Sequence, residues 1–164
     1  MIKIRNSVFE TNSSSTHSIC ISNEKFIEDL PSYVKFSLGN FGWEENRLDT
    51  INEKASYLYT AICELEQYHV ISKSECINFI VKVFNKNNIQ YDFEEPTKDP
   101  WWYGIDHVSE DDMIDFVKLV CHSEKRLLKY LFSEKSFILT GNDNDDSNVS
   151  INVTYKHEEY YKGN

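Results

Sequence analysis

The sequence has no long apolar run and no apolar leader. No stretch approaches the roughly 18 apolar residues of a membrane span, and residues 1–6 begin no apolar region of a secretion signal. These absences argue against a membrane protein and against a secreted one. We therefore expect a cytoplasmic protein that does not bind a membrane.

Basic residues are few. Only 17 Lys and Arg residues accompany 27 Asp and Glu residues, which gives a net charge of −10. A surface that binds nucleic acid must neutralise phosphates, so this charge argues against strong nucleic-acid binding by the chain alone. It also argues against an anionic membrane surface. A basic protein partner, or mimicry of nucleic acid, is compatible with it.

Cysteine pairs at metal-binding or redox spacing are absent. Each cysteine lies within or beside an apolar run, which predicts free buried thiols in a reducing cytosol. A zinc site that combines cysteine with histidine has no supporting spacing. The four cysteines are Cys20, Cys63, Cys76 and Cys121.

The acidic loop that begins near Asp143 does not match a calcium site. An EF-hand loop requires Gly at its sixth position and Glu at its twelfth. Counted from Asp143, these positions hold Asn148 and Thr154. We expect a solvated loop and no cofactor, with a magnesium site that includes Asp143 as the minor alternative.

The chain does contain enough apolar material for one folded domain. Its 164 residues are 40% hydrophobic and 14% aromatic, which argues against a disordered acidic tail. We expect a single compact domain over residues 1–164, with a frayed tail from about residue 157.

Apolar residues spaced by three and four predict helices in the middle of the chain. The longest is expected at about residues 45–68, and Asn87-Asn88 should end the next one. The further helices are expected to begin at capping serines, the first of them in a capping box. These serines are Ser72, Ser109 and Ser123.

Alternating residues predict strands near both ends of the chain. Strands at the two ends would otherwise lack partners, so we expect them to pair. The predicted fold class is α+β, a small mixed or antiparallel sheet formed by N- and C-terminal strands with three to four helices packed on it. The expected strands are residues 2–4, 18–22, 33–38, 136–140 and 149–155.

Acidic residues concentrate between Lys86 and Asp112, where eight Asp and Glu residues accompany two Lys residues. A solvated acidic surface, with aromatic side chains that plug the edge of the core, is one interpretation. The other is a surface that docks on a basic protein through complementary charge. The expected partner-binding residues are Glu94, Glu95, Asp99, Trp101 and Trp102.

A hydroxyl-rich stretch spans residues 5–18. Hydroxyls and backbone amides in such a turn can bind a phosphate, and Arg5 can form a bidentate pair of hydrogen bonds with it. His17 can transfer a proton near neutral pH, with Glu10 as its partner. The alternative is a polar loop that bonds to its own backbone.

This stretch resembles the N-terminus of a family of small proteins from phages and mobile elements of low-GC bacteria. The shared opening, R-x-x-V-F-E-T-N-S-S-S-[ST]-H-S, stands at residues 5–18, and residues 139–144 are similar to a second shared block. Some of these proteins are associated with anti-CRISPR activity. A subset of anti-CRISPR proteins shortens the guide RNA of a type II effector.

The resemblance implies that the two blocks meet across the terminal sheet and form a site for phosphodiester cleavage. His17 and Glu10 would be the catalytic residues, and Arg5 would steady the phosphate. The other phosphate-binding residues would be Asn12, Ser13, Ser14, Ser15 and Asn142, beside Asp143.

Three functions are compatible with the sequence. The first is a counter-defence protein that docks on a basic RNA-guided nuclease in a bacterial cytoplasm and cleaves or trims its guide RNA. The second is a non-enzymatic acidic inhibitor, or nucleic-acid mimic, that occupies a basic groove of a host protein. The third is a small phosphate- or nucleotide-processing enzyme.

The first hypothesis predicts that guide RNA is shortened when it is incubated with effector and protein. His17→Ala and Glu10→Ala should each abolish the shortening, because each removes a proton-transfer group. Gel electrophoresis of the RNA measures this. Intact guide RNA in every condition, or unchanged trimming by the variants, would contradict the hypothesis.

Overall fold

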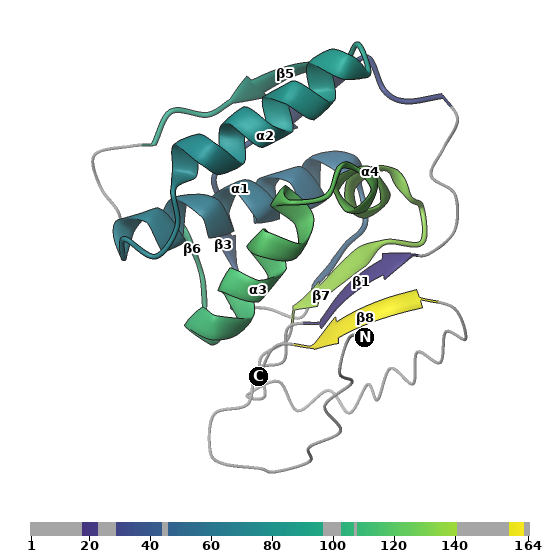
Figure 1. Ribbon diagram of the computed structural model, residues 1–164. Coiled ribbons are helices and arrows are strands. Elements are labelled where there is room, and N and C mark those ends of the chain that lie inside the picture. The colour runs from purple at the N-terminus through teal and green to yellow at the C-terminus, as the bar shows by residue number, and fades with distance from the viewer. Residues whose placement is uncertain are drawn as a thin grey trace.

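The computed structural model describes residues 18–22, 29–43, 46–96, 103–106 and 108–140, together with the backbone of residues 158–162. Its helices are α1 (Ile51–Gln67), α2 (Lys73–Lys86), α3 (Glu110–Cys121) and α4 (Glu124–Phe132). Its strands are β1 (Ser18–Ser22), β2 (Tyr33–Phe36), β3 (Asn40–Phe41), β4 (Asn46–Leu48), β5 (Gln90–Phe93), β6 (Gly104–Ile105), β7 (Phe137–Thr140) and β8 (Glu158–Lys162). The predicted α+β fold class is confirmed (Figure 1).

The main sheet joins segments from the two ends of the described chain. Its strand order is β4-β7-β1-β8, and every neighbouring pair is antiparallel. Ile19 of β1 lies opposite Ile138 of β7 on one side and Tyr161 of β8 on the other. β7, β1 and β8 run side by side below the helices (Figure 1). The predicted pairing of N-terminal with C-terminal strands is therefore confirmed.

The end of the chain differs from the expected frayed tail. Residues 158–162 form β8, which pairs with β1 over its whole length, from Ser18 opposite Lys162 to Ser22 opposite Glu158. A strand edge presents unpaired amide and carbonyl groups, and β8 supplies partners for those on this side of β1. The strands predicted at residues 2–4 and 149–155 lie outside the described residues.

The longest helix begins later than the expected residue 45. Residues 46–48 form β4 instead, and α1 starts at Ile51. Thr50 and Glu53 form a complete capping box: the Glu53 amide donates to Thr50 Oγ1 at 3.3 Å, and the Thr50 amide donates to Glu53 Oε2 at 3.0 Å. This box fixes the helix start, so the segment before it is free to pair with β7.

The other helix ends follow the predicted signals. Ser72, Ser109 and Ser123 each accept a hydrogen bond from the backbone amide three residues further on. At the end of α2, Asn88 takes a φ of 57°, and the Ile89 amide donates to the Phe84 carbonyl at 2.9 Å. This is a Schellman motif, in which a left-handed residue lets the chain satisfy the last helix carbonyls.

Helix α1 is the centre of the core. It contacts β2, β6 and each of the other three helices, and α2 lies on one side of it with α3 and α4 on the other (Figure 1). Its face toward α3 places Tyr57 against Phe116, with ring centroids 5.9 Å apart at an angle of 66°. Near β2 and β5, Phe36 stacks on Phe93 at 4.5 Å.

A lysine is buried at the start of this central helix. The side chain of Lys54 is only 1% exposed, and its Nζ donates to the carbonyls of Ser133 at 2.9 Å and Ser136 at 3.0 Å. The Tyr130 hydroxyl in turn donates to the Lys54 carbonyl at 2.7 Å. Burial lowers the pKa of Lys54 from 10.5 to about 8, although the negative charges of Asp49 and Glu53 act to raise it.

Ser136 extends this hydrogen-bond network to the sheet. Its Oγ accepts from the Ser22 amide of β1 at 3.0 Å and donates to the Lys129 carbonyl of α4 at 2.8 Å. The turn between α4 and β7 therefore binds α1, α4 and β1 together. Because these groups are buried, each bond satisfies a polar atom that water does not reach.

We predict that Lys54 makes stability rise with pH in one window. Between about pH 8 and pH 10.5 the unfolded chain retains a proton on Lys54 that the folded chain has released, so increasing pH favours folding through this residue. The wild-type unfolding free energy, relative to that of Lys54→Met, should increase by up to about 3 kcal/mol across this window.

Urea denaturation of both proteins at several pH values measures the difference. Taking the difference cancels the titration of tyrosines and cysteines, which the two proteins share. A difference that is flat or falls between pH 8 and pH 10.5 would show that Lys54 is not held in a desolvated state.

Candidate functional site

Most of the residues predicted for the site lie outside the described residues. For the proposed phosphodiesterase site, these are Arg5, Glu10, Asn12, Ser13, Ser14, Ser15, His17 and Asn142. For the partner-binding surface and the metal alternative, they are Asp99, Trp101, Trp102 and Asp143. The proximity of the N-terminal motif to the 139–144 block therefore stays a prediction.

Two predicted partner-binding residues, Glu94 and Glu95, are described, and both are exposed directly after β5. Glu94 has a structural role as well. Its Oε2 accepts from the Leu38 amide at 3.3 Å, and its carbonyl accepts from the Tyr59 hydroxyl at 2.8 Å. Glu94 thus fixes the exit of β5 against α1 while its carboxylate lies at the surface.

The described part of the acidic segment contributes to a pocket of about 320 Å³. The pocket lies where the parallel pair β3–β6 meets the C-terminal end of α1, so it combines three segments that are distant in sequence. Its wall carries three aromatic side chains, two carboxylates and two amides. The lining residues are Asn40, Trp43, Glu64, Gln67, Tyr68, Tyr103, Gly104, Ile105 and Asp106.

Backbone pairing holds the β6 wall of the pocket in place. The Gly104 amide donates to the Gly39 carbonyl at 3.0 Å, and the Asp106 amide donates to the Phe41 carbonyl at 2.8 Å. Between them, the Ile105 amide donates to Glu64 Oε2 of α1 at 2.8 Å. These hydrogen bonds join β6 to both β3 and α1 and so fix the position of this wall of the pocket.

Two aromatic side chains at this pocket are unusually exposed. Trp43 is 64% exposed and Tyr68 is 61% exposed. Trp43 follows Gly42, whose φ of 100° is a conformation that favours glycine. Large exposed aromatic side chains are enriched where proteins bind other molecules.

The end of α1 positions Tyr68. Tyr68 is the helix C-cap, and His69 after it has a φ of 58°. The Val70 amide donates to the Leu65 carbonyl at 3.1 Å, and the His69 amide donates to the Glu66 carbonyl at 2.9 Å. This second Schellman motif ends the helix at the pocket and fixes the backbone from which Tyr68 projects.

The carboxylates give the pocket a poorly solvated negative charge. Glu64 is half-buried, and burial raises its pKa, while the hydrogen bond from the Ile105 amide lowers it and the charge of Asp106 raises it. Tyr103 and Gln67 complete the polar wall, with 2.6 Å between the Gln67 Nε2 and the Tyr103 hydroxyl. A cation that enters the pocket would relieve the repulsion between Glu64 and Asp106.

This combination of groups suits a cationic ligand. The faces of Trp and Tyr rings attract ammonium and guanidinium groups, and nearby carboxylates add a direct charge interaction. No pattern in the sequence singles out four of the lining residues, Trp43, Glu64, Gln67 and Tyr68. Tyr103 and Asp106 fall in the acidic and aromatic segment, although neither is among the predicted partner-binding residues.

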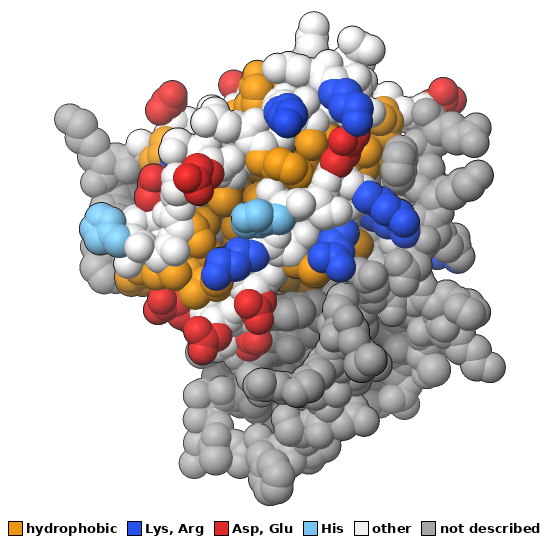
Figure 2. Space-filling view, viewed as in Figure 1, with side chains coloured by type: hydrophobic (Ala, Val, Ile, Leu, Met, Phe, Trp, Pro, Cys, Tyr) orange, Lys and Arg blue, Asp and Glu red, His pale blue; other side chains and the backbone are white. Residues whose placement is uncertain are grey.

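The face that carries α2, α3 and α4 bears charges of both signs. Figure 2 shows Lys and Arg side chains over these helices, with Asp and Glu side chains at the N-terminal end of α3 and at other points of the same face. The acidic residues of that first turn are Glu110, Asp111 and Asp112. Exposed lysines of the three helices are Lys82, Lys86, Lys118 and Lys125.

Two further findings concern metals and membranes. Among the described residues, no group of three or more His, Cys, Asp or Glu side chains is arranged to hold a metal ion. Within the same described segments, none of the helices combines the length and the apolar character needed to cross a membrane.

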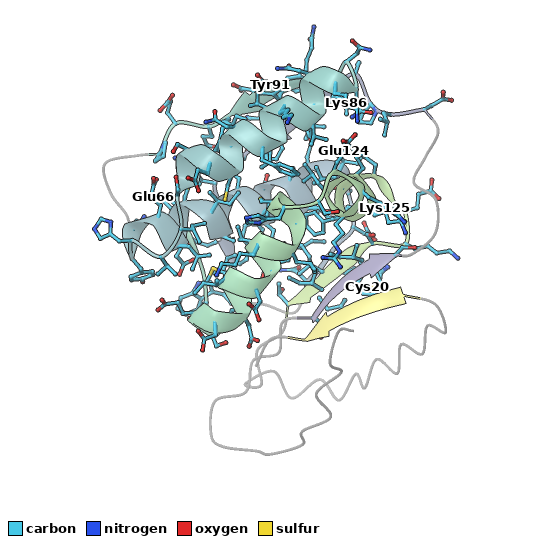
Figure 3. The ribbon with its side chains drawn as sticks, in the orientation of Figure 1. Cys20, Glu66, Lys86, Tyr91, Glu124 and Lys125 are labelled. Atoms are coloured by element: carbon cyan, nitrogen blue, oxygen red, sulfur yellow. The ribbon has the colours of Figure 1, made fainter. Side chains whose placement is uncertain are left out.

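We predict that Glu64→Ala destabilises the fold by about 1–2 kcal/mol, because the Ile105 amide loses its acceptor in a partly buried place. Glu64→Gln should cost less than half as much, since its amide oxygen can still accept. Chemical denaturation measures both. Glu66→Ala, a matched change at an exposed position of the same helix (Figure 3), should stay within about 0.5 kcal/mol. Equal losses for Glu64→Ala and Glu66→Ala would contradict the anchoring role.

Comparison with known proteins adds no family assignment. No protein-family model, curated protein or solved structure matches this chain. The chemistry of the aromatic and acidic pocket is therefore what bears on function.

Proposed function

We propose that the protein is a binding module that recognises a basic protein by taking one of its Lys or Arg side chains into the pocket of Trp43, Tyr68 and Tyr103. The observation that carries this proposal is the presence of exposed aromatic rings and a half-buried carboxylate, Glu64, in one pocket. Aromatic faces with an adjacent carboxylate bind ammonium and guanidinium groups.

The size of the pocket supports one long side chain as its occupant. Its volume of about 320 Å³ is at the lower end of small-ligand sites, which span roughly 300–1,000 Å³. The net charge of −10 would speed the encounter with a basic partner, and the local carboxylates would orient it. Exposed Glu94 and Glu95 would add further charge contacts outside the pocket.

Among the functions compatible with the sequence, this proposal corresponds to the acidic, non-enzymatic inhibitor that occupies a basic surface of a host protein. Binding of a basic RNA-guided nuclease would be one instance. Cleavage of guide RNA depends on His17 and Glu10, which lie outside the described residues, and stays a separate prediction.

Titration with a short peptide that alternates Lys or Arg with Gly and Ser tests the proposal. We expect saturable binding in isothermal titration calorimetry that weakens as salt is raised, and none for the matching peptide with Glu in place of the basic residues. Trp43→Ala and Glu64→Gln should each weaken binding roughly fivefold, because each removes about 1 kcal/mol of cation binding.

Two control variants separate the pocket from general charge and exposure. Tyr33→Ala removes another exposed aromatic side chain, which is 48% exposed on β2, and Glu134→Gln removes an exposed carboxylate outside the pocket. Neither should change the affinity more than twofold. The proposal fails if these controls weaken binding as much as Trp43→Ala and Glu64→Gln do, or if the acidic peptide binds equally well.

A further inference from the structure

A second cavity, of about 230 Å³, holds two cysteines from different helices. Cys76 lies in the first turn of α2, and Cys121 is the last residue of α3. Both side chains line the cavity, although Cys76 is only 8% exposed and Cys121 only 4%. The other lining residues are Val70, Ile71, Ser72, Glu75, Val117, Lys118 and His122.

Cys76 and Cys121 line the same cavity and each shifts the pKa of the other, so the fold brings the two thiols together while both stay free. Contacts between α2 and α3 hold the helices that carry the two cysteines, and the ion pair of Lys86 with Glu124 at 2.8 Å joins the end of α2 to the start of α4. Figure 3 shows Lys86 and Glu124 at the end of α2 and the start of α4. The thiols therefore meet in a packed setting at the wall of an accessible cavity.

The surroundings make the two thiols unequal. The hydrogen bond from Cys121 lowers the pKa of Cys76, against the opposing effects of burial and of the Glu75 and Glu66 carboxylates. The same bond, together with burial, raises the pKa of Cys121. Lys118 and His122 also line the cavity, and His122 Nδ1 lies 2.8 Å from the Lys118 carbonyl. Cys76 also lies in the first turn of α2, where the helix N-terminus favours a thiolate, whereas Cys121 is the last residue of α3, where the helix end disfavours one. Cys76 is therefore the better nucleophile of the two.

We infer that Cys76 and Cys121 form a peroxide-reactive thiol pair that closes to a disulfide between α2 and α3. The cavity admits the small oxidant, Cys76 attacks it, and Cys121 resolves the product. This modification site is independent of the aromatic and acidic pocket and does not rest on the proposed binding function.

The reaction balances with hydrogen peroxide as the oxidant. The Cys76 thiolate attacks one peroxide oxygen, the O–O bond breaks, and the products are a Cys76 sulfenic acid and hydroxide. The Cys121 sulfur then attacks the Cys76 sulfur, which forms the S–S bond and releases the sulfenic oxygen as water with the Cys121 proton. Hydroxide takes up the proton that Cys76 had lost. The two thiols give two electrons, and the peroxide is reduced to two waters.

The other two cysteines have different settings. Cys63 has its pKa raised by burial and interacts with Lys73 and Tyr59. Cys20 lies on β1 in the sheet (Figure 3), and its Sγ donates to the Lys135 carbonyl at 3.7 Å. Neither of these cysteines lines the cavity, so they serve as internal controls for reactivity.

Treatment of the full-length native protein with a small excess of hydrogen peroxide tests the inference. The number of free thiols, counted after unfolding, should fall from four to two. Peptide mapping without reductant should identify a cross-link between the peptides that contain Cys76 and Cys121, and dithiothreitol should reverse it. This mapping uses the wild-type protein, so it does not depend on whether a variant folds.

Variants then assign the two roles. Cys121→Ser should accumulate a Cys76 sulfenic acid that dimedone labels, whereas Cys76→Ser should slow the loss of thiols at least tenfold. Cys63→Ser should still form the cross-link. Four free thiols after treatment, a cross-link that includes Cys20 or Cys63, or dimedone labelling of Cys121 in place of Cys76 would overturn the inference.

Discussion

An ammonium group inside an apolar core must find oxygen acceptors, and the turn between α4 and β7 supplies them to Lys54. Two carbonyls of that turn bind the Lys54 Nζ, and the hydroxyl of Ser136 links the same turn to β1 and to α4. The central helix, the sheet and the last helix are therefore positioned by one compact set of buried hydrogen bonds. Any displacement of α1 along its axis would leave these groups unpaired in a dry interior, which fixes its register against the sheet.

Local signals in the sequence predicted most of the secondary structure. The serine caps and the apolar spacings predicted α2, α3 and α4, and alternation predicted β1 with its observed bounds. Spacing alone places the start of α1 too early, because Leu48 fits the helical period equally well, whereas the Thr50–Glu53 box marks the observed start. The pocket could not be predicted, since Trp43, Glu64 and Asp106 share no spacing and meet only through the β3–β6 pairing.

One short connection serves both sites. The Schellman motif at His69 reverses the chain after α1, so Tyr68 before it faces the aromatic and acidic pocket, whereas Val70 and Ile71 after it line the cysteine cavity. A non-glycine residue in a left-handed conformation costs energy, and here the carbonyls of Leu65 and Glu66 gain partners in return. The two cavities thus share a backbone segment although their lining differs, one being aromatic and acidic and the other carrying two cysteines.

The order of the strands also bears on how the chain acquires its structure. β1 pairs with β7 and β8, whose residues follow it by more than a hundred positions, and the four helices intervene (Figure 1). Pairings of such high sequence separation form slowly, because a long loop must close before any contact compensates for the lost entropy. During synthesis the helices can assemble around α1 first. Both edges of β1 remain unpaired until β7 and β8 have been synthesised. A chain that ends before β7 would therefore leave both edges of β1 unpaired, and unpaired strand edges favour aggregation.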